Sequence, residues 1–509
     1  MGIKLTMLVI FFVIMIGVGF CARKHTASVD GFVLGGRSVG PWLTAFAYGT
    51  SYFSAVVFVG YAGQFGWKYG LASTWIGLGN ALIGSLLAWV VLGRRTRVMS
   101  QHLHSKTMPD FFGERYDSRS LRIAASVIVF VFLVPYTASI YNGLSRLFEM
   151  AFHVPYEYCV ILMAVITALY VILGGYMATA INDFIQGIIM LIGIVAVIAA
   201  VLSGQGGFME AVNEMAQIPS DNPVTMGQPG AFTSFFGPDP LNLLGVVILT
   251  SLGTWGLPQM IHKFYAIKDE KAINTGTVIS TLFAIVISGG CYFLGGFGRL
   301  FDDPAIYNTA TGAIVYDNII PFMLSKLPDI LIGIVVVLVL SASMSTLSSL
   351  VLTSSSTLTL DFLKDNLIKQ MSEKKQVFTM QILIVFFITV SVLLALDPPT
   401  FIAQLMGISW GALAGAFLAP FLYGLYWKRV TRAAVWASFV TGVGITVSNL
   451  FIGYIASPIN AGAIAMVAGM VVVPLVSILT PKPDAGRIDA IFSCYDETVV
   501  ISKKRSLEG

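Results

Sequence analysis

Charged residues are scarce in this chain. Of its 509 residues only 11% are Asp, Glu, Lys or Arg, whereas 56% are hydrophobic and the mean hydropathy is +0.82. Water-soluble domains carry about 25% charged residues, so a soluble globular protein is excluded. The composition instead predicts an all-α protein that crosses a membrane many times.

Cysteine and histidine are also rare. The four cysteines, Cys21, Cys159, Cys291 and Cys494, show no paired spacing, so neither a disulfide framework nor a zinc site is indicated. The chain has no phosphate-binding loop, nucleophile elbow or His-Glu metalloprotease helix. We therefore expect neither an enzyme nor a transition-metal protein, and the net charge of +4 is too small to indicate nucleic-acid binding.

Long apolar runs are what the chain has in abundance. Thirteen of them reach the length of about 20 residues that one crossing needs, at residues 3–22, 41–65, 70–93, 121–152, 155–175, 180–203, 240–262, 274–298, 328–360, 378–396, 400–426, 433–453 and 460–480. The connections on one side hold 25 Lys and Arg residues and those on the other side hold 4. Because basic residues stay in the cytoplasm, we predict an outer N-terminus and an inner C-terminus.

The runs form two consecutive groups of five. Because five is odd, the two groups have opposite orientations, as in transporters with inverted repeats. The predicted divisions are 1–40 (an extra helix and a cytoplasmic loop), 41–203 (the first repeat), 204–239 (an extracellular loop), 240–426 (the second repeat), 427–481 (two more helices) and 482–509 (a cytoplasmic tail).

Two runs contain residues that weaken a helix near the middle of the membrane. The second run has Gly49 among hydroxyl residues, and the seventh has Gly253, Trp255, Gly256 and Pro258. Glycine and proline interrupt the helical hydrogen-bond ladder, and broken helices in two repeats point to a binding site. Glycines that let helices pack closely are the alternative interpretation.

A stripe of small and hydroxyl residues lies in run 328–360. Ala342, Ser345, Thr346 and Ser349 are spaced at i, i+3, i+4 and i+7, so they share one helical face. Such a face is either a site of oxygen ligands for a small hard cation, by analogy with calcium and magnesium, or a helix-packing surface.

Asp183 is an acidic residue about two turns inside a membrane run. A carboxylate at such a depth is costly and marks a functional site by default, although a carboxylate at a helix N-terminus is also favoured by the helix dipole. The run that holds Ser348 and Ser349 has the opposite direction, so these serines and Asp183 can meet in the inner half of the membrane as a cation site.

At several places the sequence resembles the sodium:solute symporter family. The resemblance covers residues from about 30 to the end of the twelfth run. It is carried by Leu34-Gly35-Gly36-Arg37-Ser38, by Leu169-Tyr170 and Gly174-Gly175 followed by Asp183 and Gln186, by Met344-Ser345-Thr346-Leu347-Ser348 and by Tyr426-Trp427-Lys428-Arg429. It implies the inverted-repeat leucine-transporter fold and sodium-coupled uptake.

The resemblance also implies ion ligands. For the family's main sodium site, it implies the backbone carbonyls of Thr50, Phe53 and Ala342 and the hydroxyls of Ser345 and Thr346. A second sodium site, found in some members, is implied at Asp183, Ser345, Ser348 and Ser349. One or two sodium ions are therefore expected per transport cycle.

The family resemblance implies less about the solute site than about the sodium sites. The solute-binding candidates are Tyr52, Ser54, Ala55, Tyr136, Thr250, Thr254 and Trp255. Tyr136 is placed like an aromatic contact of the proline symporters, but Tyr52 stands where they have an aspartate. Thr250 and Thr254 replace their paired aromatics. Tyr52, Lys68-Tyr69-Gly70-Leu71, and Gly256-Leu257-Pro258 followed by Lys268-Asp269 are more similar to the pantothenate permeases.

We therefore expect a multi-pass symporter of the cell membrane that couples sodium to the import of a small carboxylate-bearing solute. Pantothenate, another monocarboxylate or an amino acid such as proline fits this class. The expected partners are this solute, sodium and membrane lipid, and the expected functional unit is a monomer. A sugar-type solute, a non-transporting solute sensor and a passive channel are the alternatives.

Overall fold

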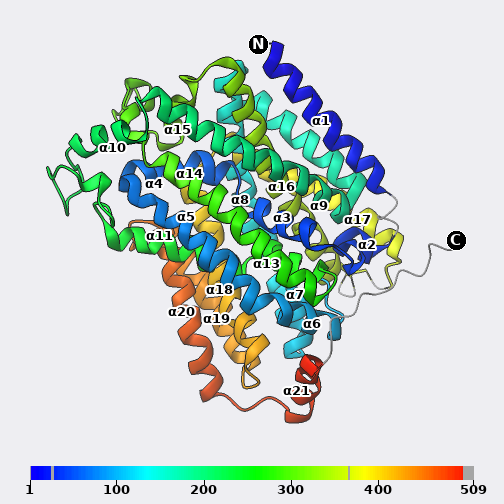
Figure 1. Ribbon diagram of the computed structural model, residues 1–509. Coiled ribbons are helices and arrows are strands. Elements are labelled where there is room, and N and C mark those ends of the chain that lie inside the picture. Colours follow the sequence, from blue (N-terminus) through cyan, green and yellow to red (C-terminus); the bar gives the residue numbers. More distant parts are fainter. Residues whose placement is uncertain (1, 24–27, 365–366, 369, 497–509) are drawn as a thin grey trace.

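The computed structural model describes residues 2–23, 28–364, 367–368 and 370–496 (Figure 1). Parts of the predicted first cytoplasmic loop and of the predicted tail at 482–509 lie outside these residues. Within the described residues the chain is helical, and extended pairing is limited to three isolated bridges. The prediction of an all-α membrane protein is confirmed.

The helices follow the apolar runs closely. The α-helices are α1 (Gly2–Ala22), α2 (Val29–Leu34), α3 (Pro41–Tyr52), α4 (Ala62–Tyr69), α5 (Thr74–Gly79), α6 (Arg94–His102), α7 (Met108–Tyr116), α8 (Arg119–Phe152), α9 (Tyr156–Gly204), α10 (Phe208–Gln217), α11 (Pro240–Leu252), α12 (Pro258–Ala266), α13 (Glu270–Ala284), α14 (Gly290–Gly295), α15 (Tyr316–Ser325), α16 (Asp329–Thr357), α17 (Glu373–Leu396), α18 (Ile402–Tyr426), α19 (Arg432–Ile452), α20 (Pro458–Leu479) and α21 (Ala485–Phe492). Wider π-helical turns occupy Val56–Tyr61, Asn80–Leu87, Trp89–Gly93, Ile285–Gly289 and Leu358–Leu363, and 3-10 turns occupy Gly35–Arg37, Gly70–Ser73, Ala231–Thr233, Gly253–Gly256, Gly298–Phe301, Pro304–Ile306 and Ser493–Asp496.

Ten helices of the described residues are long and apolar enough to cross a membrane, or eleven when the bent pair α11 and α12 is included. Two of the ten, Val56–His102 with 47 residues and Tyr156–Gly204 with 49, exceed twice the length of about 20 residues for one crossing. Each of these two long helices overlaps two of the thirteen predicted runs, which accounts for the difference between the predicted number and the observed count. The number of thirteen crossings and the orientation of the chain stay predictions. Below, the predicted cytoplasmic side is called the inner side and the opposite side the outer side.

Helix α16 lies in the middle of the bundle and packs against α3, α8 and α9. Helix α1 packs on α9 and α16, whereas α19 and α20 pack on α18. Figure 1 shows α1 and α20 at opposite edges of the molecule. The hydroxyl-rich helix is therefore enclosed by protein, which removes its polar side chains from lipid.

Two glycines fix the paths of helices around this centre. Gly175 has φ +55° and ψ −152° within α9, and a Cβ there would lie 2.9 Å from the carbonyl oxygen of Phe32. A Cβ on Gly66 would lie 1.9 Å from the carbonyl oxygen of Gly295. Only glycine permits the positive φ of the first position at little cost, and only glycine permits the contact of α4 with α14 at the second.

Candidate functional site

Helix α3 is interrupted where Gly49 and its neighbours predict a break. The helix ends at Tyr52, Phe53 is extended with φ −105° and ψ 120°, and helical structure resumes at Ala55. The last carbonyls of a helix lack donors within it. Thr50 and Phe53 therefore present carbonyl oxygens in the buried centre of the protein.

Five oxygens meet at this break. The Ser345 hydroxyl lies 3.0 Å from the Thr50 carbonyl oxygen and 3.0 Å from that of Ala342. The Thr346 hydroxyl lies 3.2 Å from the Thr50 carbonyl oxygen, 3.5 Å from that of Phe53 and 3.0 Å from that of Ala342. All five residues are at most 2% exposed. We call this group the oxygen cluster, and it joins α16 to the end of α3.

The separations suit a small cation. Oxygens about 3.4 Å apart subtend a right angle at an ion about 2.4 Å from each, which is the distance of oxygen ligands from calcium. Without an ion, the two hydroxyls can donate to only two of the three carbonyls at once. The cluster thus carries more acceptor oxygens than its own hydrogens satisfy, which favours binding of a cation.

The four residues implied for a second sodium have other partners. The Ser348 hydroxyl donates to the Ser345 carbonyl at 2.9 Å, and the hydroxyls of Ser349 and Ser51 lie 2.8 Å apart. The nearest cation to Asp183 is Lys263, whose Nζ lies 3.8 Å from Oδ2. Lys263 therefore lies between Asp183 and Ser349, because its Nζ also donates to Ser349 Oγ at 2.9 Å.

The predicted run 240–262 ends just before Lys263, so the count of basic residues places this lysine in a connection on the cytoplasmic side, and the structure corrects that placement. The side chain projects from α12 and is only 2% exposed. Its position five residues after Pro258 is the signal that could have placed it in the seventh span, because the helix that restarts at this proline continues to Ala266.

Three aromatic side chains form a cluster beside the break. The ring of Tyr52 stacks on Trp410 with centroids 5.8 Å apart, and Tyr136 meets Trp410 edge-on at 5.8 Å. The Tyr136 hydroxyl and the Trp410 indole N–H are buried and make no hydrogen bond of good geometry among the described residues, although the Tyr136 hydroxyl lies near Trp410 and Ser54. Sequence reasoning missed Trp410, whose isolated position in the glycine-rich and alanine-rich helix α18 was the available signal.

Three further solute-binding candidates, in the seventh span, donate hydrogen bonds to backbone carbonyls. The Thr250 hydroxyl donates to the Val246 carbonyl of its own helix, and that of Thr254 donates to the Gly84 carbonyl at 3.1 Å. Trp255 donates its indole N–H to the Ile83 carbonyl at 3.0 Å. Thr254 and Trp255 thus hold the broken seventh span against residues 83–84.

The remaining two candidates lie at the break itself. Ser54 Oγ accepts the Val56 N–H, and the Ala55 N–H donates to Ser343 Oγ at 3.2 Å. The hydroxyl of Tyr52, at the end of α3, donates to the Thr250 carbonyl of α11. The two broken spans are therefore tied to each other and to α16.

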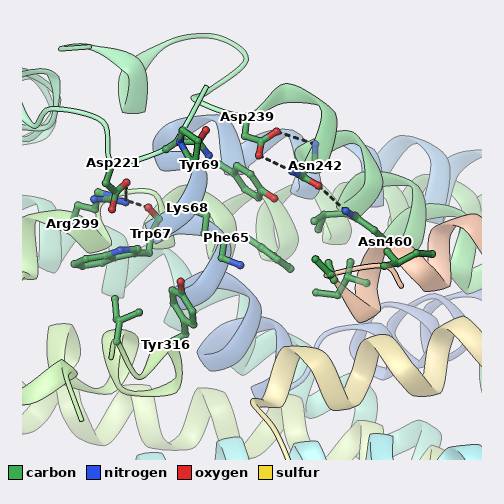
Figure 2. Close-up of a pocket in the computed structure, with 18 of the residues that line it drawn as sticks. Phe65, Trp67, Lys68, Tyr69, Asp221, Asp239, Asn242, Arg299, Tyr316 and Asn460 are labelled. Atoms are coloured by element: carbon green, nitrogen blue, oxygen red, sulfur yellow. Dashed lines mark hydrogen bonds and ion pairs between the residues drawn. The ribbon is translucent and has the colours of Figure 1, made fainter. Parts of the chain in front are cut away.

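A cavity of about 580 Å³ opens on the outer side (Figure 2). Phe65 and Tyr69 of α4 contribute aromatic walls. Lys68 Nζ lies 5.2 Å from the ring centre of Tyr316, and within the described chain no carboxylate lies at ion-pair distance from it. Arg299 is held by Asp221 at 2.6 Å. The cavity lining therefore carries charges of both signs, with Asp221 and Asp239 beside Lys68 and Arg299.

On the inner side, Arg37 ties several segments together. Its guanidinium donates to the Ser105 carbonyl at 2.5 Å, to Ser100 Oγ at 3.1 Å and to the Tyr265 carbonyl at 3.2 Å. The backbone of Val39 also pairs with Ile267 in a parallel bridge. The loop before α3 is therefore fastened to the inner ends of α6 and α12.

Asp317, on the outer side, makes the stability of the protein depend on pH. It lies on α15, outside the apolar spans, is 4% exposed and accepts the Ile402 N–H at the start of α18. Burial raises the pKa of this carboxyl to about 6 from a usual value near 3.8, although the Ile402 hydrogen bond and the Arg146 charge act against the rise.

Because the folded-state pKa is raised, this group's stabilisation is complete below about pH 4 and is lost as the pH rises through 6. We expect the unfolding free energy of the wild type to fall by about 2.4 kcal/mol relative to Asp317→Asn between pH 4 and pH 7. Thermal unfolding of both proteins in detergent at several pH values measures this difference. Asp397→Asn, at an exposed position, is the control, and parallel pH profiles for wild type and Asp317→Asn would contradict the prediction.

Comparison with known proteins gives a consistent result. Residues 32–442 match the model of the sodium:solute symporter family. The osmoregulated proline transporter OpuE of Bacillus subtilis is 28% identical over 491 residues, covering 93% of this chain and 94% of that protein. A sodium/proline symporter of Staphylococcus aureus is 30% identical over 509 residues, with 94% and 93% covered.

Two solved structures share the fold. A Na+-coupled sialic acid symporter in a substrate-bound, outward-open state has a TM-score of 0.76 at 16% identity, covering 95% of this chain and 99% of that one. A nucleobase-cation-symport-1 family transporter in a closed conformation has a TM-score of 0.51 at 12% identity, with 91% and 98% covered. At these identities the likeness concerns the fold alone.

Proposed function

Since the chain belongs to the sodium:solute symporter family, we propose that it imports a small carboxylate-bearing solute by sodium-coupled alternating access. Sodium and a small organic solute are the transported substrates of this family, and the cell membrane is its location. The relatives named above are transporters rather than enzymes.

The oxygen cluster is the observation that carries the proposal. One sodium ion would be bound there by the carbonyls of Thr50, Phe53 and Ala342 and the hydroxyls of Ser345 and Thr346. Such an ion draws α16 and the end of α3 together, so it stabilises one arrangement of the two elements over others. Coupling follows because the solute adjoins the same break, and each substrate then tightens binding of the other.

The solute would bind at the cluster of Tyr52, Tyr136 and Trp410. Aromatic faces suit the apolar body of a small solute, and the two buried donors, Tyr136 O–H and Trp410 N–H, suit the two oxygens of a carboxylate. Lys68 and Asp239 line the outer cavity through which the solute would approach this cluster. The names of the relatives make proline the first solute to test, followed by pantothenate and short monocarboxylates.

Tyr136→Phe tests the solute pocket. Its hydroxyl makes no hydrogen bond of good geometry among the described residues, so its removal costs the fold little, but a hydrogen bond to a charged solute contributes about 1.5–3 kcal/mol. We expect the solute KM to rise about tenfold or more with unchanged thermal stability. Tyr423→Phe, which removes a hydroxyl bonded to the Met470 carbonyl, is the control. A KM unchanged for every transported solute would remove Tyr136 from the pocket.

The proposal as a whole is tested by counterflow and gradient-driven uptake in proteoliposomes. L-proline, pantothenate, lactate and glucose are supplied separately, with sodium or potassium outside. We expect one carboxylate to accumulate above equilibrium only with an inward sodium gradient. Accumulation of glucose alone would overturn the solute class. Equilibration without accumulation would identify a channel, and binding without flux a sensor.

A further inference from the structure

A buried lysine occupies the region that resemblance assigns to a second sodium ion. Lys263 Nζ donates to Ser349 Oγ at 2.9 Å and lies 3.8 Å from Asp183 Oδ2. The three side chains come from α12, α16 and α9, and none is more than 3% exposed. Lys263 therefore bridges three elements within the protein interior.

The carboxylate of Asp183 needs a cation at this place. Neither of its oxygens accepts a hydrogen bond from any described residue, and a buried carboxylate without hydrogen bonds is tolerated only beside a positive charge. Lys263 is the cation at ion-pair distance. The Tyr176 ring, 5.2 Å from the same Nζ, adds a favourable face for the ammonium group.

The serines of the implied site are already engaged. Ser349 Oγ accepts from Lys263 and lies 2.8 Å from Ser51 Oγ, and Ser348 Oγ donates within α16. A sodium ion touching both Asp183 and Ser349 would lie within a few ångströms of Nζ. Two positive charges so close in a low-dielectric interior repel each other strongly. The residues therefore accommodate either Lys263 or a sodium ion.

We propose that the ammonium group of Lys263 takes the place of the second sodium, so that the protein moves one sodium ion per solute. The charge that a free ion would supply to Asp183 is here attached to α12, the inner half of the broken seventh span. This inference rests on the proposed sodium coupling through the oxygen cluster. It answers the question of one or two sodium ions in favour of one.

The sodium-to-solute flux ratio tests the inference directly. Proteoliposomes loaded with the wild type and given labelled sodium and labelled solute should show one sodium per solute and a Hill coefficient near one for sodium. Lys263→Ala removes the positive charge beside Asp183 and leaves room for a second sodium ion. The sodium-to-solute ratio of this variant should therefore rise to two, and its Hill coefficient for sodium should increase. The double variant Lys263→Ala/Asp183→Asn lacks both charges and should return to one.

Sodium binding to purified protein gives a second readout that does not depend on transport. Calorimetric titration should find one site in the wild type and in Lys263→Arg, and two in Lys263→Ala. A wild-type ratio of two overturns the inference even if no variant folds. So does a folded Lys263→Ala protein that still binds one sodium. Absence of any sodium-driven uptake by the wild type would instead overturn the proposed function.

Discussion

Thr346→Ala is expected to raise the sodium concentration for half-maximal uptake about ten- to hundredfold. The Thr346 hydroxyl faces three carbonyl oxygens at once, those of Thr50, Phe53 and Ala342, and alanine leaves these without the ligand that completes their geometry. A buried polar group that loses its partner costs about 1–3 kcal/mol, and each 1.4 kcal/mol corresponds to a tenfold change in affinity.

Initial uptake rates over a range of sodium concentrations measure this effect, together with sodium-induced shifts in thermal unfolding. Ser355→Ala is a matched control, because Ser355 is equally buried on α16 but its hydroxyl donates only to Leu352 of the same helix. We expect that control to keep wild-type sodium dependence. If Thr346→Ala folded and took up solute at unchanged sodium concentrations, Thr346 would not be a sodium ligand.

The sequence predicted those features of this region that depend on local periodicity and local backbone chemistry. The spacing of Ser345 and Thr346 places their side chains on one face of any helix, and the cluster of Gly49 with hydroxyl residues weakens any helix that contains it. The structure then brings this face to the break in α3. Their approach across about 295 positions could not be derived from spacing, and it entered the prediction only through the family resemblance.

Contacts between distant segments account for what was missed. Trp410 contacts Tyr52 and Tyr136, which lie far away in sequence. Its isolated position among small residues singles it out, but does not show which side chains it meets. Lys263 follows an apolar run and therefore looks like a loop residue, although Asp183 and Ser349 enclose it. A hydropathy pattern averages over about 20 residues, so it cannot show that one lysine at the end of a run turns inward.

Arg37→Ala is expected to open the inner side of the protein. The guanidinium holds the loop before α3 to Ser105, Ser100 and the Tyr265 carbonyl, and hydrogen bonds from a charged donor contribute about 1.5–3 kcal/mol each. If net removal of these contacts costs the inner-closed state about 2.8 kcal/mol, the ratio of closed to open protein falls about a hundredfold. Solute accumulation should fall accordingly, because an inner side that no longer closes lets the solute escape.

The alkylation rate of a cysteine placed at a buried inner position measures this opening. Gln259→Cys is suited to it, since Gln259 lies on α12 and is 1% exposed, so reagent reaches it only when the inner side opens. In this background Arg37→Ala should react up to a hundredfold faster, and Arg37→Lys less so, because lysine keeps the charge but not the planar donor geometry. Arg429→Ala is the control: Arg429 also donates to inner carbonyls, those of Ile478 and Thr480, but it fastens α20 rather than the loop before α3. An equal rate for Arg37→Ala and Arg429→Ala would show that the inner side is closed by other contacts, of which the pairing of Val39 with Ile267 is the first to examine.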